Sequence, residues 1–389
     1  MQEKAKEPEI RFAGFTGAWE QRKLGELYEK AGSGGTPNAS NASFYMGTIP
    51  FLGISDIKGR YITKTAKHIS EKGLKSSAAW MVPSGAISLA MYASVGKVGI
   101  TSVELATSQA FYNMVFASSS LRNFIFSRLE KASDNDEWLP LVSTGTQSNL
   151  NADKIKNWCI SVPNSNEQKL VGEFFKKLDN LLTLHQRKYE KLLNIKKSML
   201  EKMFPKEGEV VPEIRFKGFT GAWEQRKFGE MANRRSEVSA SGNLPRVEYE
   251  DIVSGTGTLN KDVFEKQSQK QGIVFHSGDV LYGKLRPYLQ NWLLASFNGL
   301  AVGDFWVLEP QGLNSNYLYR IIQTKQFDEI ANQSVGTKMP RADWKLVSKA
   351  TFLNPASFNE QRLIGKFFKD IDSLLTLHQR QSAGSNLPG

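Results

Sequence analysis

Apolar residues between positions 166 and 203 recur at alternating steps of three and four residues. This spacing places them on one face of a helix and is typical of a coiled-coil seam. No glycine or proline follows Gly172 until Pro205, so nothing in the sequence interrupts the helix. At the usual helical rise, a stretch of this length extends roughly 55 Å. Such a rod exposes its apolar face unless a partner covers it, so we expect a second helix.

A near copy of this pattern begins at Asn359, 193 residues after Asn166. The two copies read NEQKLVGEFFKKLDNLLTLHQR and NEQRLIGKFFKDIDSLLTLHQR. Two like helices in one chain can pair antiparallel along their apolar seams. The second copy is followed after Arg380 by QSAGSNLPG, which has no helical pattern, so we expect a shorter second helix. The predicted seam consists of Val171, Phe174, Leu178, Leu181, His185 and Leu192 in the first helix and Ile364, Phe367, Ile371, Leu374 and His378 in the second.

A second motif is duplicated as well. Residues 8–26 read PEIRFAGFTGAWEQRKLGE and residues 212–230 read PEIRFKGFTGAWEQRKFGE, which differ at only two positions. Each half of the chain therefore runs from this opening motif through a variable stretch into a long helix. We expect the tryptophan of each opening motif, Trp19 or Trp223, to staple that segment to its domain. The predicted organisation is a first domain over 1–162, a central helix over 163–205, a second domain over 206–355 and a distal helix over 356–389.

The variable stretches alternate short β-like runs with turns of Gly, Asn and Ser, and contain fewer helical patterns. We predict an α+β fold with two similar domains, each a mixed, largely antiparallel curved sheet with helices. Two long antiparallel coiled-coil helices separate the domains in a pseudo-twofold internal repeat. The predicted strands include 86–91, 97–101, 280–282 and 301–308, and the predicted helices are 121–131 and 316–331.

The chain is basic, with a formal net charge of +11 and a sequence pI of about 9.4. A basic protein of this size favours an anionic partner such as nucleic acid or a membrane surface. Cys159 is the only cysteine, which excludes an internal disulfide, and its apolar neighbours predict a buried thiol. The first residues lack the apolar core of a signal peptide, and no run approaches the roughly 18 apolar residues of a membrane span. We therefore expect a cytoplasmic protein.

The two duplicated motifs together resemble the specificity subunit of a type I restriction–modification system. The resemblance covers nearly the whole chain, because an opening motif and a closing NEQ…LLTLHQR motif frame each half. Four further segments look like parts of its target recognition domains. They are AMYASVGKVGI (90–100), SQAFYNM (108–114), GDVLYGKLRPYL (278–289) and SVGTKMPRADWKLV (334–347).

The resemblance implies a function and a set of partners. Each variable domain would read one half of a bipartite, asymmetric site in double-stranded DNA. The helices would set the unread spacer and dock two methylation subunits, which bind S-adenosylmethionine and methylate adenine. Separate restriction subunits, which are motor–nucleases, would cleave the DNA. The specificity subunit itself would have no catalysis and no cofactor, and would work in the bacterial cytoplasm.

Basic, amide and aromatic residues are the candidate DNA contacts; most lie at matching places in the two halves, while Lys58 and Arg60 flank a glycine turn of the first half. Lys and Arg neutralise phosphates, Arg can pair bidentately with guanine, and Gln and Asn can pair bidentately with adenine. The alternative is that these charges are only solvated surface and that neighbouring leucines are core. The candidates in the first half are Lys58, Arg60, Tyr92, Ser94, Lys97, Gln147, Ser148 and Asn149, and those in the second half are Lys284, Arg286, Tyr288, Lys338 and Arg341.

Motifs for catalysis are missing from the sequence. An adenine methyltransferase needs an Asn/Asp-Pro-Pro-aromatic tetrapeptide and a glycine-rich cofactor loop, and neither occurs. The four histidines form no HExxH, so no metal site is expected. Two alternatives stay open. The chain could be a self-contained DNA-modifying enzyme with unrecognised motifs, or a structural repeat protein whose basic surface binds an acidic protein.

Overall fold

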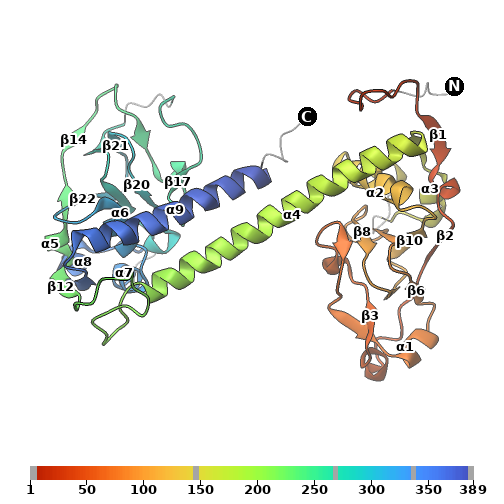
Figure 1. The fold of residues 1–389 in the computed structure, drawn as a ribbon, viewed down its shortest axis with the longest axis horizontal. Coiled ribbons are helices and arrows are strands. Elements are labelled where there is room, and N and C mark those ends of the chain that lie inside the picture. The colour runs from red at the N-terminus through yellow and green to blue at the C-terminus, as the bar shows by residue number, and fades with distance from the viewer. Residues whose placement is uncertain (1–6, 143–148, 266–269, 334–338, 384–389) are drawn as a thin grey trace. The chain divides into compact units, whose positions relative to one another are not determined.

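The computed structural model describes residues 7–142, 149–265, 270–333 and 339–383, and the chain divides into two compact units, Met1–Thr183 and Leu184–Gly389 (Figure 1). The division falls inside helix α4 (Ser165–Lys202), which Figure 1 draws as one uninterrupted helix. Asn164 caps it, because its side chain accepts a hydrogen bond of 3.0 Å from the Glu167 N–H. The long helix predicted from the apolar pattern is confirmed.

The first unit is built on two mixed sheets. In both sheets most neighbours are antiparallel, while β4–β8 and β3–β9 are parallel. Helix α2 (Ser119–Asp134) buries Phe124, Ile125 and Leu129 in the core of this unit. The five-stranded sheet has the order β2 (Lys30–Ser33), β10 (Phe111–Val115), β7 (Ile87–Ala90), β8 (Val98–Thr101), β4 (Tyr61–Ile62). The four-stranded sheet has the order β5 (Lys67–Ile69), β3 (Ile49–Phe51), β9 (Leu105–Thr107), β6 (Trp80–Val82). The short helices are α1 (Glu71–Lys75) and α3 (Ala152–Asn157).

The second unit also contains two four-stranded sheets, in which β15–β21 is the parallel pair. A hairpin of β16 (Ile252–Val253) and β17 (Thr258–Leu259) accompanies them. The sheet orders are β13 (Ala232–Arg235), β22 (Phe305–Pro310), β19 (Val280–Gly283), β20 (Trp292–Leu294), and β14 (Val238–Ser239), β18 (Gly272–Phe275), β21 (Gly299–Ala301), β15 (Arg246–Val247). The helices are α5 (Phe228–Met231), α6 (Ser315–Ile321), α7 (Lys325–Ala331), α8 (Trp344–Lys349) and α9 (Phe358–Ala383). The prediction of mixed, largely antiparallel sheets with helices is confirmed within each unit.

Two predicted elements of the second unit are broken where the backbone turns. The run 301–308 is divided between β21 and β22 because Gly303 adopts a φ of 104°, a conformation that glycine accepts without strain. The stretch 316–331 forms α6 and α7 rather than one helix. Thr324 starts α7 by accepting a hydrogen bond from the Phe327 N–H, which ends the continuous pattern.

The duplicated motifs meet in the same way in each unit. Strand β1 (Glu20–Lys23) pairs with β11 (Cys159–Val162), and β12 (Glu224–Lys227) pairs with β23 (Thr351–Asn354), all antiparallel. The arginine of each opening motif forms a bidentate ion pair with the glutamate of the NEQ motif. These pairs are Arg11–Glu167, at 2.7 and 2.8 Å, and Arg215–Glu360, at 2.6 and 2.8 Å.

The opening-motif tryptophans are structural, as predicted. Trp19 lies edge-on to Phe124 with ring centroids 5.7 Å apart, and Trp223 lies edge-on to Tyr317 at 6.3 Å. Trp223 also donates a hydrogen bond from Nε1 to Glu360. Both rings therefore hold the opening motif against a helix of their own unit.

The predicted seam needs correction in the second helix. Ile364 and Ile371 are buried, but Leu374 is exposed and Phe367 only partly buried, whereas their neighbours Phe368 and Leu375 are buried. The reason is that α9 packs chiefly against α6 of its own domain. At these two positions the residue on the buried face is therefore the one that follows the predicted residue.

Within the second unit, α4 also contacts α9. His185 and His378 face each other with their Nδ1 atoms 3.0 Å apart, and Lys196 pairs with Asp372 at 2.7 Å. These contacts run in opposite directions along the two helices. Coiled-coil pairing along the whole seam stays a prediction, as does the pairing role of Val171, Phe174, Leu178, Leu181 and Leu192.

The prediction that Cys159 is buried is wrong. Cys159 is exposed on β11, while Ile160 and Val162 of the same strand are buried. Side chains alternate between the two faces of a strand, and the cysteine lies on the outer face. None of the helices within the described residues is both long and apolar enough to cross a bilayer.

Candidate nucleic-acid interface

The second unit brings together basic residues from two separate segments. The first segment is the loop from Lys284 to Asn291, between β19 and β20, and the second surrounds Arg341. The Arg286 N–H donates to the Pro340 carbonyl at 2.7 Å, and the Ala342 N–H donates to the Lys284 carbonyl at 2.8 Å. Lys338, also a predicted contact, lies outside the described residues. The structure therefore joins Lys284, Arg286 and Arg341 at one surface.

The loop after β19 holds two non-glycine residues in the left-handed region. Arg286 has a φ of 49° and Gln290 a φ of 55°, and they flank a short 3₁₀ turn at Pro287–Leu289. Such conformations cost roughly 1–2 kcal/mol each and are common at binding sites. The turn leaves Arg286 exposed and Tyr288 56% exposed. A cation and an aromatic ring are thus exposed together, a combination that suits phosphate neutralisation and base stacking.

A carboxylate lies between the cations of this surface. Asp304, just before β22, accepts a hydrogen bond of 3.0 Å from Arg341 and lies 3.4 Å from the Lys284 ammonium. Burial raises the pKa of Asp304, but the hydrogen bond from Arg341 and the charge of Lys284 outweigh it. The pKa therefore lies below its ordinary value, and the carboxylate is charged at neutral pH.

The first unit repeats this construction with different side chains. Tyr92, Ser94 and Lys97 lie in or at the end of the loop between β7 and β8. The segment after the undescribed stretch returns to this loop, because the Leu150 N–H donates to the Met91 carbonyl at 3.0 Å and so places Asn149 beside it. Gln147 and Ser148 lie outside the described residues. The loop again contains left-handed residues, Ala93 at a φ of 27° and Ser94 at 59°.

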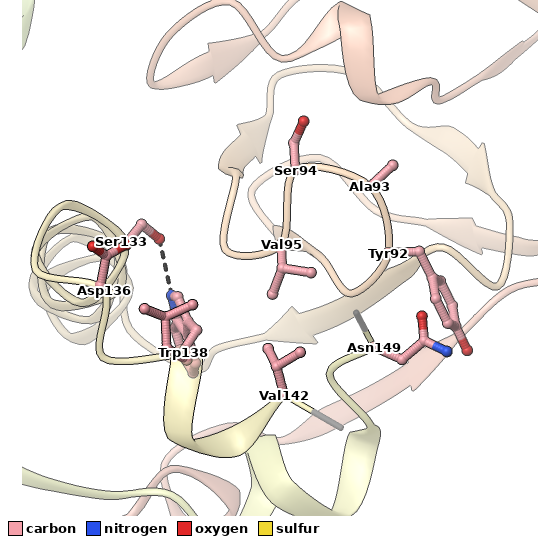
Figure 2. A pocket seen from close by; sticks show the side chains of 10 residues that line it. Tyr92, Ala93, Ser94, Val95, Ser133, Asp136, Trp138, Val142 and Asn149 are labelled. Carbon is pink, nitrogen blue, oxygen red and sulfur yellow. Dashed lines mark hydrogen bonds between the residues drawn. The ribbon is translucent and has the colours of Figure 1, made fainter. Parts of the chain in front are cut away.

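A cavity of about 450 Å³ opens beneath the first-unit loop (Figure 2). Tyr92 and Asn149 lie beside each other at one edge of it, and Trp138 lies across from them. Ser94 points away from Trp138 in that view, and both Ser94 and Lys97 are exposed. Gly96 fits against Trp138 only because it lacks a side chain, since a Cβ there would lie 2.6 Å from the indole ring.

Of the two remaining first-unit candidates, Lys58 is exposed and Arg60 is not. The Arg60 side chain is 2% exposed, pairs with Asp179 of α4 at 2.6 Å and stacks over Phe126 with 4.4 Å to the ring centroid. Its guanidinium also donates to the Asn123 carbonyl. Arg60 therefore holds α4 to its own domain, and its assignment as a DNA contact is withdrawn.

Glu130, a partly buried glutamate on α2, lies near the Arg60–Asp179 ion pair. Burial, followed by the charge of Asp179, raises the pKa of Glu130 on α2 to about 8. Between the ordinary glutamate value and pH 8 the folded state then holds a proton that the unfolded state has lost. By linkage, the stability of the first unit falls as pH rises through this window and levels off above it.

Glu130→Gln is accordingly expected to remove this pH dependence and to stabilise the first unit by about 2–4 kcal/mol at pH 9. Urea unfolding at several pH values between 5 and 9 measures it. Glu104→Gln, at an exposed position of the same unit, is the matched control and should keep the wild-type slope. Parallel pH profiles for wild type and Glu130→Gln would refute the assignment.

Two further residues of the second-unit surface were not predicted from the sequence. Asp304 holds the cations, and the Tyr249 hydroxyl donates to the Asp304 carbonyl at 2.5 Å and accepts from the Leu285 N–H at 3.0 Å. Neither residue stands in a recognisable motif. Among the described residues, no group of three or more His, Cys, Asp or Glu side chains is arranged to hold a metal ion.

Comparison with known proteins assigns the family. The model of the type I restriction modification DNA specificity domain matches residues 17–194. The specificity subunit of the type I restriction enzyme MjaIX from Methanocaldococcus jannaschii is 23% identical over 349 residues, covering 83% of this chain and 79% of that protein. That of HindI from Haemophilus influenzae is 28% identical over 169 residues, covering 42% of this chain and 37% of that protein.

A solved structure supports the same fold. The crystal structure of a type I restriction–modification system S subunit from M. genitalium aligns with a TM-score of 0.67 at 15% identity. The alignment covers 97% of this chain and 95% of that one. At this identity the likeness concerns the fold, while the domain model and the sequence relatives carry the family. Residues 17–194 therefore belong to the family of type I restriction modification DNA specificity domains, and the chain as a whole is similar to specificity subunits of type I restriction enzymes.

Proposed function

We propose that this chain is a specificity subunit that reads a bipartite, asymmetric site in double-stranded DNA, with one half read by each variable domain. The observation that carries the proposal is the repeated construction of the two loops. Each follows a buried strand, each contains left-handed non-glycine residues, and each is joined by a second segment from later in the chain. Since the same scaffold presents unlike side chains in the two units, two unlike half-sites follow.

The side chains of the two loops suit different bases. In the second unit, Arg286 can pair bidentately with guanine, while Lys284 and Arg341 can neutralise phosphates. In the first unit, Asn149 can pair with adenine, and Tyr92 can contribute stacking or a hydroxyl contact. Lys58 and Lys97 are exposed cations that suit phosphate contacts. A formal charge of +11 supports DNA as the partner.

We further propose that α4 and α9 set the unread spacer and dock two methylation subunits. The support is an apolar surface on α4: Phe174, Leu178 and Leu181 are each more than a third exposed, with Leu181 at 51%. Contiguous exposed apolar side chains of this kind mark interaction sites. The methylation subunits would bind S-adenosylmethionine and methylate adenine, and separate restriction subunits would cleave, in the bacterial cytoplasm. In this proposal the chain itself supplies no catalytic residue.

Reconstitution tests this division of labour. The purified chain is incubated with DNA and labelled S-adenosylmethionine, alone and with its methylation subunits. Methyl transfer is expected only in the mixture, and transfer by the chain alone would indicate an enzyme. DNA affinity of the chain should fall steeply with salt, because several phosphate contacts release counterions. A flat salt response would instead favour an acidic protein partner.

Arg286→Ala is expected to weaken binding by about 1–3 kcal/mol if Arg286 reads a guanine. Base preference should relax only in the half-site read by the second unit. Competition binding with duplexes substituted in one half-site at a time measures both effects. Lys325→Ala removes an equally positive but highly exposed side chain of the same unit and should change neither. Loss of preference in both half-sites would contradict the assignment of one domain to one half.

A further inference from the structure

Asp304 is an acidic residue inside the basic surface of the second unit. We infer that Asp304 and Tyr249 are positioning residues that hold Lys284 and Arg341 in place before DNA binds, and thereby set the discrimination at the second half-site. The inference rests on the proposed function, because it concerns how the same surface distinguishes one DNA sequence from another.

The contacts of Asp304 tie three segments together. Its carboxylate reaches Lys284 at 3.4 Å and Arg341 at 3.0 Å, and its carbonyl accepts from the Lys284 N–H at 2.9 Å. The Tyr249 hydroxyl joins the same carbonyl to the Leu285 N–H. Leu285 and Arg341 form a β-bridge. Each cation is thus held through both its side chain and the backbone beside it.

The carboxylate changes what the two cations can do. A free Lys or Arg on a loop binds any phosphate within reach, and such contacts carry no sequence information. Here a phosphate must compete with Asp304 for Lys284 and Arg341, which lowers the gain from binding arbitrary DNA. A DNA sequence whose groups match the fixed directions of these side chains loses less binding free energy to this competition. The reason is that the side chains are already ordered before the DNA binds. Asp304 therefore weakens non-specific binding more than specific binding.

The first unit provides an internal comparison. Strand β10 begins with Phe111 as β22 begins with Phe305, so Ala110 occupies the place of Asp304. Residues 50–57 parallel 245–252, which puts Ile54 in the place of Tyr249. The first unit consequently lacks both the carboxylate and the phenol. Any effect of Asp304 and Tyr249 on discrimination is expected at the second half-site alone.

The test measures affinity of the full chain for four duplexes by fluorescence anisotropy. One carries the bipartite site mapped by adenine methylation in cells that produce the chain and its methylation subunits, two carry base substitutions in one half-site each, and one is unrelated. Asp304→Asn should raise affinity for the unrelated duplex about threefold. Discrimination at the second half-site should fall about tenfold, while discrimination at the first half-site stays unchanged.

Two companion variants separate positioning from charge and from folding. Glu224→Gln removes the same charge from an exposed position of β12 and should reproduce neither effect. Tyr249→Phe keeps the charge and should lower second half-site discrimination without raising affinity for unrelated DNA. Unchanged discrimination in Asp304→Asn, a parallel loss for all duplexes, or the same effect in Glu224→Gln would each overturn the inference. A wild-type chain that does not prefer the bipartite duplex would instead overturn the proposed function.

Discussion

Replacing Arg215 with alanine is expected to lower the free energy of unfolding of the second unit by about 3–5 kcal/mol. The Glu360 side chain is 1% exposed, and its carboxylate accepts hydrogen bonds from both Nε and Nη2 of Arg215. Among the described residues, removing the arginine leaves the buried carboxylate with one side-chain hydrogen bond, the long one of 3.4 Å from Trp223. A buried charge without its partner is among the most destabilising changes that a single substitution makes. Arg215 also donates to the Gly221 carbonyl at 2.6 Å, so the opening motif itself loses its anchor.

Urea unfolding of the full chain, followed by tryptophan fluorescence, measures the loss. Arg226→Ala is the matched control, because Arg226 is a partly exposed arginine of strand β12 that donates a hydrogen bond to the Glu230 carbonyl and pairs with no carboxylate of the described residues. It should cost no more than about 0.5 kcal/mol. Adding Glu360→Gln to Arg215→Ala should recover part of the loss by removing the unpaired charge. A loss below about 1 kcal/mol for Arg215→Ala would refute a structural role for the pair.

Deleting residues 186–192 from α4 is expected to shorten the unread spacer of the DNA site while leaving both half-site sequences intact. Seven residues correspond to two helical turns and roughly 10 Å of rise, or about three base pairs of B-DNA. A deletion of seven keeps the apolar stripe on the same face of the helix. The segment precedes Lys196 and Met199, whose contacts with the second unit are therefore retained in the chain.

Methylated adenines mapped in cells that produce the deletion variant with its methylation subunits give the new spacer directly. The control is a variant in which the seven residues at positions 186–192 are all present but in a scrambled order. Because its helix has the wild-type length, it should retain the wild-type spacer. An unchanged spacer in the deletion variant, or altered bases in either half-site, would argue against α4 as the element that sets the distance.

The elements that could be predicted from the sequence are those with a strong local pattern. The apolar steps and the absence of breakers between 173 and 204 placed the long helix within a residue or two of Ser165–Lys202. The near-exact duplication of the opening and closing motifs led us to expect equal roles in both halves. The structure joins them in each unit through Arg11–Glu167 and Arg215–Glu360.

What could not be predicted depends on contacts between distant segments. Each long helix has two adjacent phenylalanines, and the sequence pattern allows either one to lie on the buried face. In α9 the packing against α6 buries Phe368 rather than Phe367. Arg60 has the same local signature as a surface cation, and its burial depends on Asp179 far along the chain. Asp304 stands in no motif, so its place between Lys284 and Arg341 emerges only from the fold.

The most direct test of the account is a genome-wide map of methylated adenines in a bacterium that produces this chain together with its methylation subunits. We predict that the modified adenines lie in one motif, whose two unlike parts are separated by a constant number of unspecified bases. A motif without such a gap, or one whose two parts are inverted copies of each other, would contradict the claim that two different readers work from one chain.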